Sequence, residues 1–473
     1  MAKHVEYEKV GSDYLEHRQL KRGAAGWVLL AGLGVSYVIS GDFAGWNFGL
    51  EQGGWGGLLV ATVLMGAMYT CMVFGLAELA SALPVAGGGY GFARRALGPL
   101  GGFATGIAIL IEYAMAPAAI AVFIGGYVET LGLFGLTNSW PVYLVCFVVF
   151  IGVHLYGVGE ALRLMFVITG VAVVALVVFV IGMVPAFDSD KLFDVVGGEG
   201  GFLPFGVAGA LGALVYAIWF FLGVEGVPVA AEEARDPQRD MPRGIIGAML
   251  VLLVFAGAIL VLAPGGAGSE ALKTSDNPLP AAARAAYGDG SVLAQVVNYV
   301  GLAGLVASFF SLIFAYSRQL FALSRAGYLP RWLSRTGRRK TPYLALAVPG
   351  VIGFALASIT RDGAQLINIA VFGAALSYVL MMVSHIVLRV REPELERPYR
   401  TPGGVVTTGV ALVLAVAAVV ATFFVDELAA GITAGIVVVA LAYFWFYSRH
   451  HLVASAPEEE FAAIARAEEE LKD

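Results

Sequence analysis

The chain has 473 residues, of which 59% are hydrophobic and only 14% are charged, and its mean hydropathy is +0.81. Soluble domains carry nearly twice that share of charge, so the composition excludes an ordinary soluble protein and indicates a polytopic membrane protein. The net charge of -6 says little about partners, because charge placement matters more than its sum in a membrane protein. The two cysteines, Cys71 and Cys146, lie in separate apolar runs, which favours buried thiols over a disulfide.

Twelve apolar segments along the chain are long enough to cross a bilayer as helices. We therefore predict an all-α protein with twelve transmembrane helices, preceded by a charged cytoplasmic segment (1–23) without a signal-peptide core and followed by a cytoplasmic tail (448–473). The predicted spans are 24–50, 56–82, 99–127, 139–157, 161–185, 204–230, 243–263, 292–322, 343–360, 364–389, 404–425 and 428–447.

The basic residues predict the orientation. With a cytoplasmic N-terminus, the outer loops hold only four of the 29 lysines and arginines, and the other 25 lie inside or at inner helix ends. This asymmetry places both termini in the cytoplasm. The basic run at 325–343 is expected to be a cytoplasmic loop against anionic lipid rather than a nucleic-acid-binding segment. The four outer residues are Lys191, Lys273, Arg284 and Arg361.

Two of the apolar segments are interrupted by small residues followed by an acid, Asp42 in the first and Glu225 in the sixth. A carboxylate at membrane depth is costly unless a site uses it, and irregular backbone is tolerated there only beside protein or a water-filled cavity. Each interrupted segment opens a block of five helices, which predicts two inverted repeats, 24–203 and 204–390, with two appended helices in 391–447. The predicted helix breaks contain Ser40, Gly41, Gly45, Gly223 and Gly226.

Several motifs resemble those of the amino acid–polyamine–organocation permeases. They are AELASALPVAGGGYGFARRALG at 77–98, WFFLGVEGVPVAAEEARDPQRDMPRGI at 219–245, and the later stretches SRQLFALSRAGYLP and RPYRTPGG. The resemblance covers nearly the whole chain with the motifs in order. It implies the five-plus-five LeuT-like fold, alternating access, and a site between helices 1, 3, 6 and 8.

The first helix departs from the usual pattern of that family. Amino-acid permeases commonly place small residues here, whose amides and hydroxyl bind the substrate carboxylate. This chain reads SYVISGDFAGWNFGL, with Trp46 and Asn47 at that place and Asp42 just before them. This sequence is most similar to that of the ethanolamine permease branch, and the resemblance implies a bacterial plasma-membrane permease.

Four acids lie at membrane depth, namely Asp42, Glu78, Glu112 and Glu225, and no Lys or Arg lies mid-segment in their helices. An unpaired buried carboxylate is unfavourable, and a cationic substrate can supply the missing partner in a dry site. The sequence therefore predicts an organic-cation site at Asp42, Glu112 and Glu225. Each of the three also has a structural alternative: capping the broken helix, bonding a buried hydroxyl, or bonding freed backbone. Glu78 lies near the inner end and is expected to be structural.

Aromatic side chains supply the remaining expected walls of the site. Cation–π contact with an ammonium is expected for Trp219 or Trp46, and the resemblance implies that the tryptophan matching Trp219 contacts cationic substrates. Tyr113 follows Glu112, and Phe221 is preferred to Phe220 as the ring facing the cavity. Ordinary packing is the alternative for each of these rings.

The coupling ion is left open among three mechanisms: proton symport through Asp42 or Glu225, sodium symport, and exchange or uniport, with proton-linked transport or exchange preferred. A sodium site between helices 1 and 8 would use Ser308 or Ser311. No metal site, cofactor motif or catalytic triad is predicted, and the glycine-rich run at 87–92 lacks the context of a phosphate loop. His154 and His385 are expected at the membrane interface.

These observations predict a secondary transporter, not an enzyme, that imports a small cationic amine such as ethanolamine by alternating access. Its expected partners are the amine, the lipid bilayer and a coupling proton or sodium ion, with no nucleic acid. An amino-acid or polyamine permease or exchanger of the same fold is the nearest alternative. A membrane sensor that binds an amine without transporting it is a more distant one.

Overall fold

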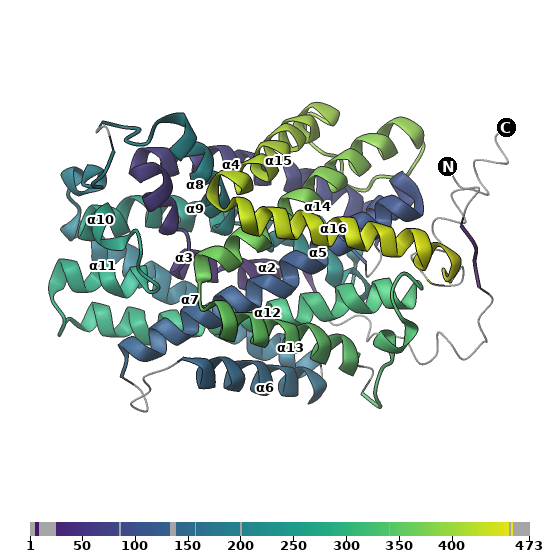
Figure 1. Cartoon of the computed structure of the whole chain (residues 1–473), viewed down its shortest axis with the longest axis horizontal. Helices are drawn as coiled ribbons and strands as arrows, with labels where there is room; N and C mark the ends of the chain where they lie inside the picture. Colours follow the sequence, from purple (N-terminus) through teal and green to yellow (C-terminus); the bar gives the residue numbers. More distant parts are fainter. Residues whose placement is uncertain are drawn as a thin grey trace.

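The computed structural model describes residues 5–8, 25–84, 87–132, 139–156, 158–198, 201–339, 341–453 and 456. Every secondary-structure element of more than one residue in this part of the chain is helical, and the long helices lie side by side in one bundle (Figure 1). Most of the predicted N-terminal segment (1–23) and of the tail (448–473) lies outside the described residues.

The helices follow the order of the predicted spans. The first half of the chain forms α2 (Trp27–Val38), α3 (Ser40–Phe43), α4 (Phe48–Ala82), α5 (Gly89–Thr130), α6 (Trp140–Tyr156) and α7 (Val158–Met183). The second half forms α8 (Gly206–Trp219), η4 (Val224–Glu233), α9 (Pro237–Ala267), α12 (Val292–Arg325), α13 (Tyr343–Thr360), α14 (Gly363–Arg391), α15 (Val405–Val425) and α16 (Glu427–Phe446). Short helical turns in the connections are η2 (Val184–Ala186), η3 (Ser189–Phe193), α10 (Ser269–Leu272), α11 (Pro278–Tyr287), η5 (Arg331–Ser334) and η6 (Ser448–His450).

Ten helical segments among the described residues are long and apolar enough to cross a membrane. Two shorter apolar stretches, Trp27–Phe43 and Trp140–Tyr156, occupy the positions of the first and fourth predicted spans. The prediction of an all-helical, multi-pass membrane protein is therefore confirmed. The number of twelve crossings stays a prediction.

Two of the predicted loops are much shorter in the structure. Helix α4 runs from Phe48 to Ala82 with non-helical backbone only at Gly54 (φ +64°), and α5 runs from Gly89 to Thr130 with a similar kink at Gly98 (φ +79°). Glycine reaches positive φ at little cost, so a single residue can redirect the chain where the sequence predicts a longer connection. A side chain at Gly54 would also collide with Pro204.

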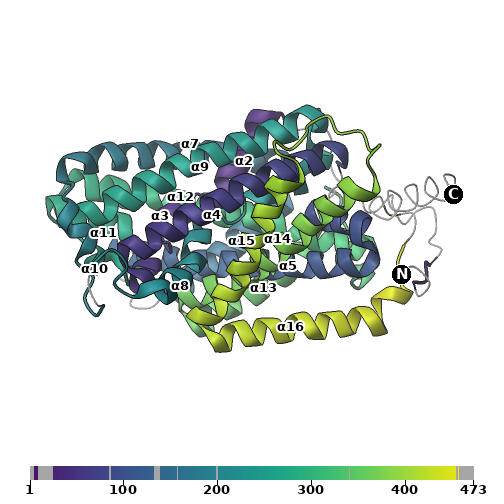
Figure 2. The same cartoon turned by 90° about the horizontal axis from the view of Figure 1, so that it is seen from above.

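The inner helices of the bundle are α5, α12 and α14. Helix α5 packs along both α14 and α12, whereas α4 packs between α8 and α9. At the edges of the bundle lie α6, next to α13, and α16, which stands apart from the other helices when the molecule is viewed from above (Figure 2). The turns α10 and α11 lie at the end opposite the C-terminal end of α16 (Figure 1).

The described parts of the two chain ends meet on one side of the molecule. Tyr7 forms a bridge with Leu452, and the Glu6 amide donates to the Arg449 carbonyl (2.8 Å). Arg331 of η5 forms an ion pair with Glu8. The N-terminal segment, the C-terminal segment and the basic loop after α12 thus share one end of the bundle, as an even number of crossings requires.

Glu78 joins α4 to α14 at this same end. Its buried carboxylate accepts from Arg389 (Nε, 2.9 Å) and the Thr401 amide (2.7 Å), forms an ion pair with Arg397 (Nε, 3.0 Å), and lies 3.3 Å from His385 Nε2. A carboxylate with this many donors is a structural anchor rather than a ligand site.

The two membrane-end histidines are not interfacial, contrary to the prediction. His385 is fully buried, and its ring nitrogens contact Thr401 and Thr408. His154 is 1% exposed and its ring lies against Phe310, with a centroid distance of 4.1 Å. Positions near a helix end look interfacial in a linear sequence, but neighbouring helices and loops cover these two side chains.

Glu78→Gln is expected to destabilise the protein, because removing one partner of a buried ion pair leaves arginine charge without compensation, at a cost of about 3 kcal/mol. The melting midpoint of the purified protein in detergent should fall by several degrees. Glu51→Gln, which changes an exposed acid on the same helix, is the matched control and should melt like the wild type. Equal midpoints for both variants would show that the Glu78 contacts contribute little.

Candidate functional site

The first helix is broken between Val38 and Phe48. Helix α2 ends at Val38, α3 is a single turn, and the chain then passes through extended backbone at Ala44 (φ −160°, ψ 158°) and left-handed backbone at Gly45 (φ +97°). A Cβ at Gly45 would lie 2.6 Å from Nε1 of Trp219. Both the backbone angle and the space therefore require glycine at this position.

The sixth predicted helix is broken in the same manner. Helix α8 ends at Trp219, Gly223 has left-handed backbone (φ +108°), and the chain continues as the 3₁₀ segment η4, which contains Pro228. The Gly223 amide donates to Oε2 of Glu225 (3.2 Å). Glu225 therefore stabilises backbone that the break has freed, which is the structural role that the sequence leaves open for it.

The two breaks lie against each other. A side chain at Gly41 would collide with the carbonyl of Trp219, and the Trp219 indole donates to the Ala44 carbonyl (2.9 Å). A Cβ at Gly226 would lie 3.0 Å from both the Tyr37 ring and the Tyr113 hydroxyl. The small residues at the predicted breaks thus permit close approach of the two interrupted helices.

The tryptophan and asparagine that distinguish the first helix have different environments. The Trp46 ring is stacked on Phe220 (centroids 5.6 Å apart, 18° between planes), and its indole nitrogen has no hydrogen-bond partner among the described residues. Asn47 accepts from the Gly45 amide (3.1 Å) and donates to the carbonyls of Leu272 (2.7 Å) and Ser275 (2.8 Å). Asn47, which the sequence does not single out as a site residue, therefore ties the break to α10.

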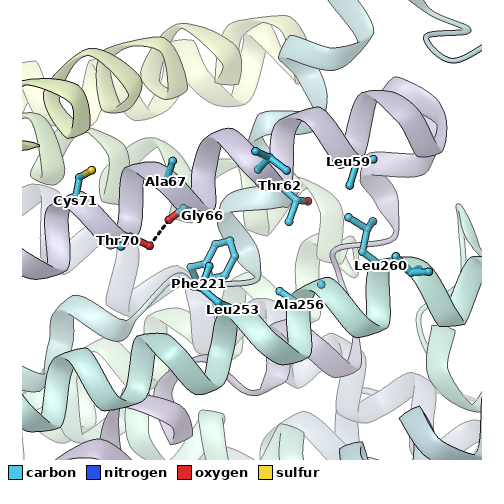
Figure 3. A pocket seen from close by; sticks show the side chains of 13 residues that line it. Leu59, Thr62, Gly66, Ala67, Thr70, Cys71, Phe221, Leu253, Ala256 and Leu260 are labelled. Atoms are coloured by element: carbon cyan, nitrogen blue, oxygen red, sulfur yellow. Dashed lines mark hydrogen bonds between the residues drawn. The ribbon is translucent and has the colours of Figure 1, made fainter.

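Phe221, which the sequence analysis prefers as the ring facing the cavity, points away from the stacked rings of Trp46 and Phe220. Phe220 is the ring that meets Trp46, whereas Phe221 contacts Tyr69 (5.4 Å between centroids) and lines a groove between α4 and α9 (Figure 3). Neighbouring residues at a helix end point in different directions, and the sequence alone does not say which one faces the other break.

Asp42, Glu112 and Glu225 are all buried, with exposures of 0%, 0% and 3%. No ion pair joins any of them to a basic side chain within the described part of the chain. Both carboxylate oxygens of Asp42 also lack a hydrogen-bond donor among those residues. The site therefore holds buried acidic groups without positive charge beside them.

The structure brings two of these acids together and leaves the third apart. Glu112 on α5 and Glu225 on η4 lie close enough to interact electrostatically, although both carboxylate oxygens of Glu112 and Oε1 of Glu225 have no hydrogen-bond partner among the described residues. Asp42 has no comparable electrostatic contact with either glutamate. The expected single cluster of three acids is thus divided into a pair and a separate carboxyl group.

Buried tyrosines surround the glutamate pair. Tyr113 and Tyr69 both lie close enough to interact electrostatically with Glu112 and Glu225, and the Tyr378 hydroxyl lies beside Glu225. The hydroxyls of Tyr69 and Tyr378 are bonded to each other (2.8 Å). The sequence analysis missed Tyr69 and Tyr378. Both could have been noticed as tyrosines within apolar segments, because a buried tyrosine hydroxyl needs a polar partner.

The two serines considered for sodium binding are engaged in contacts between α2 and α12. Ser308 donates to the Ser36 carbonyl (2.7 Å) and accepts from the Ser40 amide (2.9 Å). Ser311 donates to the Ala307 carbonyl (2.7 Å), and its hydroxyl contacts that of Ser36. These hydroxyls therefore connect the first helix to α12. No group of three or more metal-ligating side chains occurs among the described residues.

Together, a helical bundle of membrane length, two facing helix breaks and buried acids at those breaks describe a membrane transporter. A profile of the amino acid permease family matches residues 26–447. The chain therefore belongs to the amino acid permease family.

The relatives differ in their named substrates. An uncharacterized transporter of Rhizobium meliloti (strain 1021) is 31% identical over 89% of this chain and 90% of its own length. The branched-chain amino acid permease BcaP of Bacillus subtilis (strain 168) is 27% identical over 75% of this chain and 78% of its own. The methylthioribose transporter of the same strain is 25% identical over 78% of this chain and 80% of its own length. Family membership thus establishes a transporter and leaves the substrate to be argued from the site.

Gly45→Ala is expected to destabilise the helix break, because the new methyl group meets Trp219 and the backbone angle disfavours any L side chain, a strain of order 1–3 kcal/mol. Melting of the purified variant should begin several degrees below the wild type. Gly435→Ala, at a helical glycine on α16 with open space around it, provides the control. If the two variants melt alike, the close packing of the breaks is not required.

Proposed function

We propose that this protein is a secondary transporter that imports a small organic amine by alternating access, and that ethanolamine is its substrate. The observation that carries the proposal is the set of buried carboxyl groups, Asp42, Glu112 and Glu225, without a basic partner among the described residues. A cationic substrate supplies the missing positive charge, and its attraction to the acids is strong where water is excluded.

Asp42 is the proposed anchor for the ammonium group. It lies in the break of the first helix, is fully buried, and has two carboxylate oxygens without a donor in the described chain. In the same break the Trp46 indole nitrogen is a buried donor without a partner. An amino alcohol carries both complementary groups, an ammonium for Asp42 and a hydroxyl oxygen for Trp46.

The backbone around this break supports an amine over an amino acid. A zwitterionic substrate needs free donors for its carboxylate, and the Gly45 amide is already engaged by Asn47. The Trp46 side chain also occupies the place where amino-acid permeases have small residues, and the acids nearby repel an anion. An amino-acid or polyamine substrate is the second candidate, and the name of one relative, a branched-chain amino acid permease, favours it.

The aromatic rings and the two glutamates, Glu112 and Glu225, complete the proposed site. Trp219 uses its indole nitrogen on Ala44 and so offers the substrate only its ring faces. The Tyr113 hydroxyl lies beside Gly226 of the sixth-helix break, and the Phe221 ring packs on Tyr69 of α4. We assign the coupling proton to Glu112 and Glu225, because two buried carboxylates close enough to interact repel each other unless one of them is protonated. The pair can then release that proton to the inner side when the site opens there.

Sodium is the less suitable coupling ion for this site. Ser308 and Ser311, whose hydroxyls lie between α2 and α12, are bonded to backbone and to Ser36. A sodium ion there would have to compete with these contacts. We therefore infer proton symport in place of sodium symport.

The proposed transport cycle uses two inverted repeats, α2 to α7 and α8 to α14, with α15 and α16 appended. The matching breaks in the first helix of each block support this division. The concentration of arginine at the end where both chain termini lie favours a plasma membrane location with cytoplasmic termini.

Purified protein in liposomes is expected to take up labelled ethanolamine, and Asp42→Asn should lower the initial rate at least about tenfold, because the ammonium loses its charged partner. Asp190→Asn, at an exposed loop acid, is the control and should transport normally. Uptake of labelled alanine or 4-aminobutyrate that unlabelled ethanolamine does not inhibit would instead favour the amino-acid alternative. Binding of amine without any uptake would favour a sensor.

Ethanolamine uptake is expected to accelerate when the outside of the vesicle is more acidic than the inside, and to be unchanged when sodium is replaced by potassium. Glu225→Gln should remove the response to the pH gradient, because an amide cannot carry the coupling proton. Initial rates under the two imposed gradients measure both effects. Sodium-driven uptake that survives in Glu225→Gln would contradict the assignment.

A further inference from the structure

The loop between α12 and α13 carries positive charge that the proposed transport mechanism does not use. Residues 325–343 include six lysines and arginines and no acid. Arg331 forms an ion pair with Glu8. Three further arginines are exposed and form no ion pair with any acid in the described part of the chain, namely Arg335, Arg338 and Arg339.

Exposed aromatic side chains place this loop at the membrane surface. Trp332 of η5 is 48% exposed, Tyr156 at the end of α6 is 75% exposed, and Tyr343 at the start of α13 is also exposed. Tryptophan and tyrosine are enriched where hydrocarbon meets the lipid headgroups. Farther along the same two helices, the exposed side chains are apolar, such as Val148 and Val351. The arginines therefore lie at the headgroup level of a lipid-facing edge.

Arg339 joins the loop to α6. Its guanidinium carbon lies 3.9 Å from the centre of the Tyr156 ring, and its Nη1 donates to the Tyr156 carbonyl. Segment η5 packs against both α12 and α13, and α13 packs against α6 at one edge of the bundle (Figure 1). The loop therefore lies across the ends of three helices, at the periphery of the bundle.

The start of α13 adds partial positive charge to the arginines. Its N-cap is Pro342, and no side chain caps the first turn. The amides at a helix N-terminus attract anions, and arginine guanidinium groups bind phosphate oxygens through charge-assisted hydrogen bonds. The loop thus combines two kinds of phosphate-binding group.

We propose that this loop binds the phosphate of an anionic phospholipid such as phosphatidylglycerol, with its acyl chains against α6 and α13. The sequence predicts only general contact between the basic run and anionic lipid; the exposed arginines, the aromatic side chains and the uncapped helix start define a site. A free phosphate or a nucleic acid offers the same anion. The lipid is favoured because Val148 and Val351 continue the surface as apolar area that hydrocarbon covers.

A headgroup bound here connects the ends of three helices. It contacts the loop that η5 fixes to α12 and α13, and Arg339 extends the contact to α6. A ligand that binds the native state and not the unfolded state raises the free energy of unfolding by mass action. Phosphatidylglycerol should therefore stabilise the protein as well as bind to it.

Native mass spectrometry of the full chain tests this site. The purified protein is mixed in detergent with equal amounts of phosphatidylglycerol and phosphatidylcholine that have the same acyl chains, and the bound lipids are counted. The wild type should retain phosphatidylglycerol preferentially. Combined replacement of Arg335, Arg338 and Arg339 by glutamine should lower the affinity for phosphatidylglycerol at least about fivefold, the factor for the ~1 kcal/mol that one basic residue contributes near an anionic surface. Binding of phosphatidylcholine should be unchanged.

A second triple variant controls for the loss of charge alone. Replacing Arg235, Arg239 and Arg243 by glutamine removes the same charge from exposed positions at the start of α9, where Asp236 and Asp240 lie between the arginines. This variant should retain phosphatidylglycerol like the wild type. Added phosphatidylglycerol should raise the melting midpoint of the wild type and of this control, but not that of the loop variant.

Equal retention of both lipids by the wild type overturns the proposal, as does unchanged phosphatidylglycerol binding in the loop variant or an equal loss in the control. Displacement of the lipid by the same concentration of inorganic phosphate would indicate a free-anion site instead, and displacement by a labelled RNA oligonucleotide a nucleic-acid site. The wild-type preference should also weaken as salt is added, a measurement that requires no variant to fold. None of these outcomes depends on which solute is transported.

Discussion

Broken helices at membrane depth free backbone groups that lipid cannot satisfy, and the structure depends on how protein side chains satisfy them. At the break of the first helix, every partner comes from within the two breaks or from the helices packed beside them. The bonds hold the breaks together and at the same time fix their geometry. The four pairs are Ser308 with the Ser40 amide, Tyr127 with the Phe43 carbonyl, Trp219 with the Ala44 carbonyl and Asn47 with the Gly45 amide.

These hydrogen bonds to the backbone of the break also limit which groups a substrate can bind. Amide and carbonyl groups at a helix break are the usual ligands for the charged ends of an amino acid, and here those at Ala44 and Gly45 are already in use. In the first-helix break, the groups without a partner in the described part of the chain include two side chains, the Asp42 carboxylate and the Trp46 indole nitrogen. In the proposed amine site, recognition therefore depends on side chains in place of backbone groups, and the acids among them favour a cation over an anion.

Much of the fold was predictable from the sequence because the bilayer imposes a simple rule of length and hydropathy. The positions of the helices and the two glycine-containing breaks follow from this rule together with the cost of a buried acid. What could not be predicted depends on helix rotation and on contacts between distant segments. Phe220 rather than Phe221 meets Trp46, Glu112 lies near Glu225 whereas Asp42 interacts with neither, and Thr401 and Thr408 contact the buried His385. Kinks at Gly54 and Gly98 show that one glycine can replace a loop.

Helix α4 connects the three regions that transport would have to coordinate. Glu78 anchors one end of it to α14 and to the loop at Thr401, so this part of the bundle is held by charge. Its middle presents Tyr69 to the glutamate pair, and its outer face forms the wall of the groove behind Phe221. The charged end of α4 is thus held by several ion pairs and hydrogen bonds, whereas its contact with the sixth-helix break at Phe221 and Tyr69 is a packing of two rings.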